Sequence, residues 1–159
     1  MLPKPARIET SALSRREMIA ALAAIPLLQA CASTAPARIT VYRDPGCGCC
    51  DEWTRQIRTA FATEIDVIDT ADRGALHQQA GMPASLASCH TAMIEGLAFE
   101  GHVPSADIKR FLKERPAGYK GLAVPGMPNG SPGMEGPEPP DHFAVIAFGN
   151  GITNQFAVY

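Results

Sequence analysis

The first half of the chain alternates between β-rich and helical patterns of apolar residues. Trp53, Ile57 and Phe61 recur at four-residue spacing, which predicts one apolar face of a helix over residues 49–62. Acidic residues in the first turn favour this helix, because negative charge interacts well with the helix N-terminus. The other elements expected in this half are a strand at 38–42, a half-buried strand at 64–68 and a short helix at 73–80.

The second half predicts two β-hairpins. They cover residues 91–100, with a turn at 95–96, and residues 143–159, with a turn at 149–151.

One helix and one long loop are expected between the hairpins. The helix opens at Pro104 and ends near Pro116, and its inward-facing residues are Ile108, Phe111 and Leu112. Residues 116–140 hold seven of the 14 prolines and six of the 14 glycines, so a loop with little regular structure is predicted. The order β-α-β-α-β-β-α resembles an α/β thioredoxin-like fold, with a Pro/Gly-rich insertion loop and an added C-terminal β-hairpin.

The start of the chain predicts an export signal over residues 1–31. Arg15 and Arg16 precede an apolar segment, as in a twin-arginine signal, although the ordinary secretory route stays open. The segment is too short to span a bilayer, which takes about 20 apolar residues. A buried N-terminal helix is the alternative interpretation.

The end of this segment has two interpretations. Residues 28–31 resemble a lipoprotein box, with Cys31 as the lipidated residue. Small residues around Cys31 also fit a cleavage site that would discard it. Residues 32–37 then form a short tether, and residues 38–159 form the thioredoxin-like domain. The expected location is the periplasm or cell envelope, with membrane attachment only through the signal or a lipid on Cys31.

Charge argues against one class of partner. The formal net charge is −2, and it becomes −4 without residues 1–31. No run of lysine or arginine follows residue 16, so nucleic-acid binding is not expected. A mildly acidic surface suits a cationic ligand.

Three of the five cysteines lie in the CxCC motif Cys47-Gly48-Cys49-Cys50, at the start of the first predicted helix. Free backbone N–H groups and the helix dipole stabilise a thiolate at such a position. Thiolate is the form that attacks disulfides and also the form that binds metal. The position therefore favours both chemistries.

Cys49 is the residue that distinguishes disulfide exchange from metal binding. A thiol–disulfide oxidoreductase needs Cys47 as nucleophile and Cys50 as resolving thiol, whereas a third thiol benefits a soft metal ion. Cys89 and His90 start a strand near the same helix and could complete the site. Export and the excess of sulfur favour copper(I). A closed zinc site and a pair of structural disulfides, Cys47–Cys50 with Cys49–Cys89, stay open as alternatives.

Further candidate ligands lie in the loops. Met127 and Met134 occur in the polar Pro/Gly-rich loop, where thioether sulfur could bind copper(I) and the loop could cover the cysteines. The alternative is that they only pack this loop onto the domain. His102 is either a second nitrogen ligand or a helix cap. Met82 and His142 could lie near the cluster, whereas Met93 is predicted to be a core residue and His77 to face solvent.

Five segments occur in the order found in a known family. They are 42–50 (YRDPGCGCC), 86–91 (LASCHT), 100–104 (EGHVP), 121–128 (GLAVPGMP) and 130–135 (GSPGME). Over residues 39–159 the chain thus resembles the CopG-type copper-resistance proteins, whose domain has long been described as of unknown function. The positions that match the family motifs are Cys47, Cys49, Cys50, Cys89, His90, His102, Met127 and Met134.

This resemblance implies a thioredoxin-like fold, a periplasmic location and copper held by cysteine sulfur. It also implies a redox role between Cu(I) and Cu(II), which would make the protein a copper oxidoreductase. The expected partners are a metal ion and other periplasmic copper-handling proteins.

Overall fold

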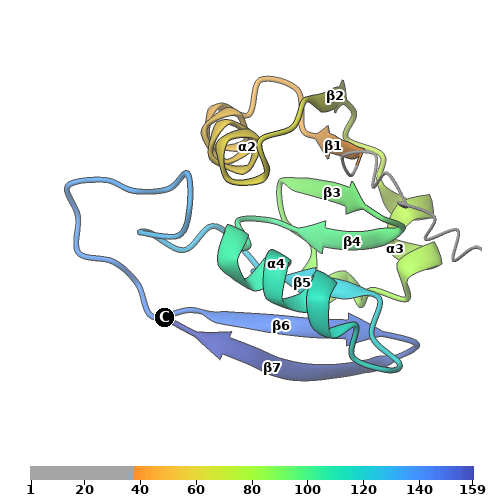
Figure 1. The fold of residues 1–159 in the computed structure, drawn as a ribbon. Coiled ribbons are helices and arrows are strands. Elements are labelled where there is room, and N and C mark those ends of the chain that lie inside the picture. Colours follow the sequence, from red (N-terminus) through yellow and green to blue (C-terminus); the bar gives the residue numbers. More distant parts are fainter. Residues whose placement is uncertain (1–37) are drawn as a thin grey trace, which may run out of the picture. The chain divides into compact units, whose positions relative to one another are not determined.

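A seven-stranded mixed sheet forms the framework of residues 38–159, the part of the chain that the computed structural model describes (Figure 1). The strand order is β2-β1-β3-β4-β5-β6-β7. The strands are β1 Ile39–Arg43, β2 Ile65–Asp69, β3 His90–Ile94, β4 Leu97–Glu100, β5 Gly121–Ala123, β6 Ala144–Gly149 and β7 Ile152–Val158. The pairs β1–β2 and β4–β5 are parallel, and the other four are antiparallel.

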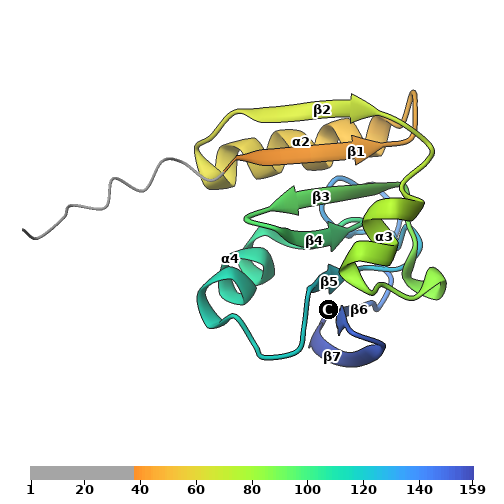
Figure 2. The same cartoon turned by 90° about the vertical axis from the view of Figure 1, so that its right-hand side faces the viewer.

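Three α-helices accompany the sheet in this part of the chain, and Figure 2 shows α3 and α4 on opposite sides of the strands. The helices are α2 Gly48–Phe61, α3 Gly74–Ala80 and α4 Ser105–Glu114, and a 3₁₀ turn, η1, covers Ala84–Leu86. None of the helices in residues 38–159 is long and apolar enough to cross a membrane.

The sheet has a hydrophobic core on each face, because side chains alternate along each strand. Trp53 and Ile57 of α2 and Phe111 of α4 pack with Phe99 and their neighbours on one face. Met82, just after α3, packs with the smaller group on the other face. The predicted apolar faces of α2 and α4 are therefore confirmed.

The structure adds one strand that the sequence did not predict and corrects another. β5 lies inside the segment predicted to have little regular structure, and it is fully buried between β4 and β6. Gly121 permits this pairing, because a Cβ there would lie 1.8 Å from the carbonyl oxygen of Ala98. β2 is an edge strand in which only Ile65 is buried, so it is not the half-buried strand that its alternation suggested. The α/β class is confirmed, and the thioredoxin-like assignment stays a prediction.

Candidate metal centre

The pairing of β1, β3 and β4 gathers several chain segments at one end of the sheet. Arg43 at the end of β1 pairs with His90 at the start of β3, so the residues beyond them lie side by side. The Asp44 N–H donates to the carbonyl of Cys89 at 3.0 Å, and the Gly101 N–H donates to the carbonyl of His90 at 2.8 Å. These bonds place Cys89 and the residues after β4 beside the start of α2.

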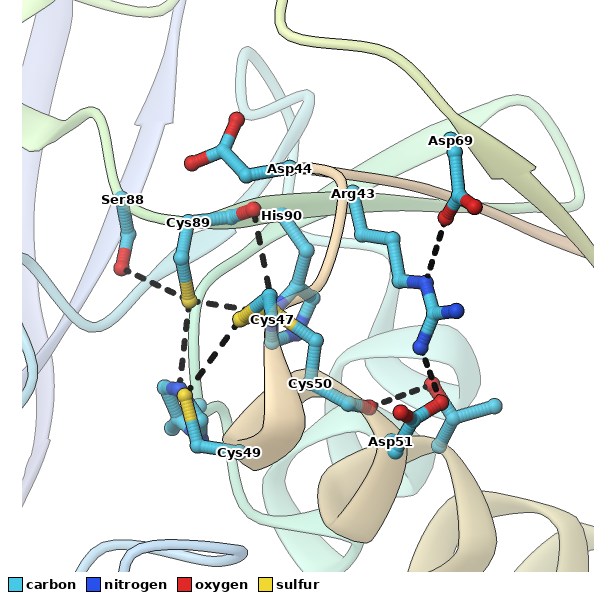
Figure 3. The surroundings of a disulfide bond; sticks show 12 residues. Arg43, Asp44, Cys47, Cys49, Cys50, Asp51, Asp69, Ser88, Cys89 and His90 are labelled. Atoms are coloured by element: carbon cyan, nitrogen blue, oxygen red, sulfur yellow. Dashed lines mark hydrogen bonds and ion pairs between the residues drawn. A yellow bond between two sulfur atoms is a disulfide. The ribbon is translucent and has the colours of Figure 1, made fainter.

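Three cysteines occupy the start of α2. Cys47 is the N-cap residue, and no side chain caps the helix. The free N–H groups of the first turn therefore face this end. Cys47 and Cys50 form a disulfide, with their Cα atoms 5.4 Å apart, whereas Cys49 and Cys89 are free thiols (Figure 3). The alternative of two disulfides that use all four cysteines is not what this structure shows.

Cys89 belongs to two groups of side chains that could hold a metal ion. The groups are Cys47, Cys49, Cys50 and Cys89, and Cys89, His90 and His102. Within each group, one ligand atom per residue lies within 4.8 Å of the others. The Sγ of Cys89 lies 3.3 Å from Nε2 of His102 and 3.5 Å from Nδ1 of His90. We call these six residues the Cys/His centre.

The hydrogen bonds of His102 leave one ring nitrogen free for a ligand. Its Nδ1 lies 2.8 Å from the carbonyl oxygen of Pro132. A carbonyl only accepts, so Nδ1 carries the proton and Nε2 directs a lone pair towards Cys89. Metal-binding histidines commonly donate their other N–H to a carbonyl, which fixes the tautomer and the ring orientation.

His90 is fully buried between two aromatic rings. Its ring centroid lies 4.4 Å from that of Trp53 and 5.1 Å from that of His102. Among the side chains of residues 38–159, only two buried nitrogen or oxygen atoms lack a hydrogen-bond partner, and they are His90 Nε2 and Arg73 Nε. His90 belongs to the Cys/His centre, and Arg73 adjoins it through its bond to the carbonyl of Ser88. Buried polar atoms without a partner are uncommon in folded proteins, so this clustering singles the region out.

Burial controls the protonation of these side chains. It lowers the pKa of His90 to about 3, with smaller contributions from His102 and Arg73, and it also lowers the pKa of His102. Burial, and then the neighbouring Cys49, raise the pKa of Cys89 to about 11. Both imidazoles are therefore neutral and able to bind a cation near pH 7, whereas a metal must displace a proton from Cys89.

The Pro/Gly-rich segment packs against the start of α2. Gly133 has φ +83°, and a Cβ there would lie 2.7 Å from the backbone nitrogen of Trp53 and 2.9 Å from the carbonyl oxygen of Cys49. Gln56 of α2 donates to the carboxylate of Glu135 at 3.0 Å. Together with the bond from His102 to Pro132, these contacts hold the segment beside the centre.

The two candidate methionines have different surroundings. Met127 is exposed, and with Asp44, Ser88 and Cys89 it lines an open hollow of about 290 Å³. Met134 is partly buried in the segment that packs on α2, and its backbone N–H donates to the carbonyl oxygen of Ser131 at 2.7 Å.

Other candidates lie elsewhere. Met82 belongs to the smaller hydrophobic core, and Met93 packs partly buried against it. His142 is exposed, with Nδ1 3.3 Å from the carbonyl oxygen of Tyr159. The prediction that His77 faces solvent is wrong, because its Nε2 lies 3.2 Å from the buried carboxylate of Glu100. The export signal and Cys31 lie outside the described residues.

Two charged residues beside the centre were missed in the sequence. Glu100 is fully buried, and Arg73 is 7% exposed. Burial raises the pKa of Glu100, whereas its hydrogen bonds oppose this shift. The sequence pattern that could have indicated Glu100 is its position at the end of the apolar run Leu97-Ala98-Phe99. Arg73 has no such pattern around it, because it falls in a polar stretch before α3.

Solved structures similar to this chain support a copper-related assignment. A structure described as "Copper resistance protein copG- Form 1" shares 40% sequence identity, covers 79% of this chain and 98% of its own, and superposes with a TM-score of 0.70. A second, "Copper resistance protein copG- Form 2", also shares 40% identity, covers 79% and 99%, and has a TM-score of 0.69.

Two sequence comparisons give less information about function. The family described as "Protein of unknown function, DUF411" matches residues 86–134, which include Cys89, His90 and His102. No curated protein matches the chain.

Proposed function

Because the chain belongs to the CopG family of copper-resistance proteins, we propose that it binds copper at the Cys/His centre and either sequesters it or interconverts Cu(I) and Cu(II). The single observation behind this proposal is the position of Cys89. Its sulfur joins a group of three further cysteines to two neutral imidazoles.

The donor set favours copper(I) over zinc. Soft thiolates select Cu(I), and adjacent thiolates can bridge several ions. A closed zinc site uses four ligands, whereas the Cys/His centre offers six side chains. Met127 at the neighbouring hollow and Met134 in the adjoining segment would add thioether sulfur, which needs no deprotonation.

The disulfide defines the redox states available to the centre. In the oxidised form Cys47 and Cys50 are not thiolates, so full copper binding requires their reduction. When the reduced protein encounters Cu(II), the Cys47 and Cys50 sulfurs each give one electron to a Cu(II) ion. Two Cu(II) become two Cu(I), the S–S bond forms, and any thiol protons are released. The chain can therefore act as a copper reductase as well as a copper store.

The remaining parts of the account are also proposals. Residues 1–31 would export the domain to the periplasm, with Cys31 either lipidated or removed. The order β1-α2-β2 followed by β3-β4-α4 supports a thioredoxin-like arrangement. Other copper-handling proteins of the same compartment would be its partners.

Anaerobic titration of the reduced protein with Cu(I), followed by metal analysis, tests copper binding. The reduced wild type should retain copper, and the Cys47/Cys49/Cys50→Ser variant should lose most of it. A parallel titration with Zn(II) checks selectivity. Met82→Leu is a matched control, since it removes a sulfur atom from the opposite core. Equal copper retention by wild type and the triple variant would overturn the proposal.

The same disulfide favours a second function, thiol–disulfide exchange. Cys47 is partly exposed and suits a nucleophile, whereas Cys50 is buried and suits a resolving thiol. Cys49→Ser discriminates the two functions. Exchange with a small disulfide should survive this substitution, whereas copper binding at a centre that needs the third thiol should weaken.

A further inference from the structure

Ser88, the residue before Cys89, has all its polar groups fixed by other parts of the chain. Its backbone N–H donates to Oε1 of Glu100 at 2.7 Å, and its carbonyl accepts from Nη2 of Arg73 at 2.8 Å. Its hydroxyl donates to the carbonyl of Gly126 at 2.6 Å. A loop residue directly before a metal-ligand candidate is thus held from three directions.

The two groups that hold the Ser88 backbone are buried charges. Glu100 is fully buried, and its second oxygen accepts from Thr91 and lies 3.2 Å from Nε2 of His77. Arg73 is 7% exposed and leaves its Nε without a partner among the described residues. Burying ionisable side chains is costly, so their burial is weak evidence for a role in stability. The Ser88 backbone groups that they hold in place give a better account of their role.

Arg73 also connects the two cysteine-bearing segments. Its Nη1 donates to Oδ1 of Asp44 at 2.6 Å, and the Asp44 backbone N–H donates to the carbonyl of Cys89 at 3.0 Å. Asp44 leads into the segment of Cys47, where the Cys47 N–H donates to the carbonyl of Asp44 at 3.2 Å. A single guanidinium therefore bridges these segments, in addition to the direct backbone bond between them.

Gly101 packs closely against the Ser88 side chain. A Cβ at Gly101 would lie 2.8 Å from Oγ of Ser88 and 2.5 Å from the carbonyl oxygen of Val124. The Ser88 side chain thus rests directly on the backbone that leads to His102. The Ser88 peptide cannot shift without disturbing this contact.

We infer that Arg73 and Glu100 are positioning residues that hold the Ser88 peptide and thereby preset the Cys89 sulfur against the other donors of the Cys/His centre. This inference rests on the proposed copper function. Metal sites need donors placed to within a few tenths of an ångström, and loss of an outer-shell partner commonly weakens metal binding about 10–100-fold.

The test compares Arg73→Met and Glu100→Met with conservative and remote variants. Glu100→Gln keeps an oxygen that can accept from Ser88 and should retain near-normal Cu(I) affinity. Arg110→Met is the remote control, because Arg110 bonds Asp107 and the carbonyl of Phe156, away from the cysteines.

Two readouts are measured on each reduced, folded variant. The first is Cu(I) affinity in competition with a chromophoric chelator, expected to fall about 10–100-fold in Arg73→Met and Glu100→Met but not in Arg110→Met. The second is the alkylation rate of Cys89 in metal-free protein, followed by peptide mass spectrometry, which should change in the same two variants alone. Wild-type affinity together with a wild-type Cys89 rate in Arg73→Met would overturn the inference.

The design separates the two proposals. If the wild type binds no Cu(I), the proposed function fails, and the Cys89 alkylation rate still decides the positioning role. If Arg73→Met does not fold, Arg73→Lys replaces it, since one ammonium cannot reproduce the fork that reaches both Asp44 and Ser88. Unchanged affinity and Cys89 reactivity in folded Arg73→Lys would count against the inference.

Discussion

Two polar clusters lie at different places in this domain, and they differ in how fully their buried atoms are paired. One is the Cys/His centre with its neighbours. The other joins α4 to the C-terminal hairpin: Asp107 accepts from the Tyr159 hydroxyl at 2.7 Å and from Arg110 at 3.0 Å. Arg110 also donates to the carbonyl of Phe156 at 3.2 Å and lies 3.8 Å from its ring centroid.

The difference between the clusters favours the Cys/His centre as the candidate ligand site. In the α4–hairpin cluster, no buried side-chain nitrogen or oxygen lacks a partner. The Cys/His centre has two free thiols and the unpartnered His90 Nε2, with Arg73 Nε close by. A fully paired cluster stabilises the fold, whereas free thiols and an unpartnered imidazole nitrogen can bind a cation, which the guanidinium Nε of Arg73 cannot.

Cys89→Ser should give the largest effect on copper, because Cys89 belongs to both ligand groups. The loss of Cu(I) affinity should exceed the roughly 10–100-fold typical of outer-shell partners. Chelator competition measures it, with Tyr159→Phe as the control from the α4–hairpin cluster. An affinity equal to wild type would remove Cys89 from the site.

Gly133→Ala should affect both stability and copper. The new Cβ would meet the backbone of α2 at 2.7 Å, so the segment must move and pull Pro132 away from His102. We expect about 1–3 kcal/mol of lost stability and weaker Cu(I) binding.

Gly151→Ala is the matched control for Gly133→Ala. It has a similar φ of +78° in the hairpin turn but would meet nothing within 4 Å. Denaturant unfolding and chelator competition measure both variants. Equal behaviour of the two alanines would show that contact between the segment and α2 does not matter.

Tyr159→Phe should affect stability alone. It removes the hydroxyl that donates to Asp107, and because Tyr159 is half exposed, the expected loss is about 1 kcal/mol. Urea unfolding should show this loss, whereas Cu(I) affinity stays at the wild-type value. Tyr119→Phe is the control, since Tyr119 has no side-chain hydrogen bond to another described residue. A changed copper affinity in Tyr159→Phe would break the distinction between the clusters.

The pH dependence of this bond gives the smallest effect. Partial burial and then Asp107 raise the pKa of Tyr159 to about 12. The folded state therefore favours the protonated phenol, so its contribution is complete below the ordinary value of about 10 and is lost as pH rises through about 12. The stability difference between wild type and Tyr159→Phe should shrink over that window. A constant difference would contradict the assignment.

Local patterns in the sequence were sufficient for much of the fold. The four-residue spacing of Trp53, Ile57 and Phe61 predicted α2, and the turn at 95–96 predicted the β3–β4 hairpin. β5 escaped notice because a three-residue strand between glycine- and proline-rich segments has no periodicity of its own. Only its position between β4 and β6 makes it a strand.

Local sequence patterns also predicted part of the candidate site. Clustered cysteines and the adjacent Cys89-His90 indicate metal chemistry without a structure. The buried state of Glu100, its contact with His77 and the link from Arg73 to Ser88 depend on tertiary packing. No sequence spacing encodes these contacts, so the supporting roles of these residues follow only from the three-dimensional structure.

X-ray absorption at the copper K edge, on reduced protein loaded anaerobically with Cu(I), tests the central claim most directly. The account predicts a first shell dominated by sulfur with a smaller nitrogen contribution, which decreases in His102→Asn but not in His142→Asn. A first shell of oxygen or nitrogen without sulfur would contradict it.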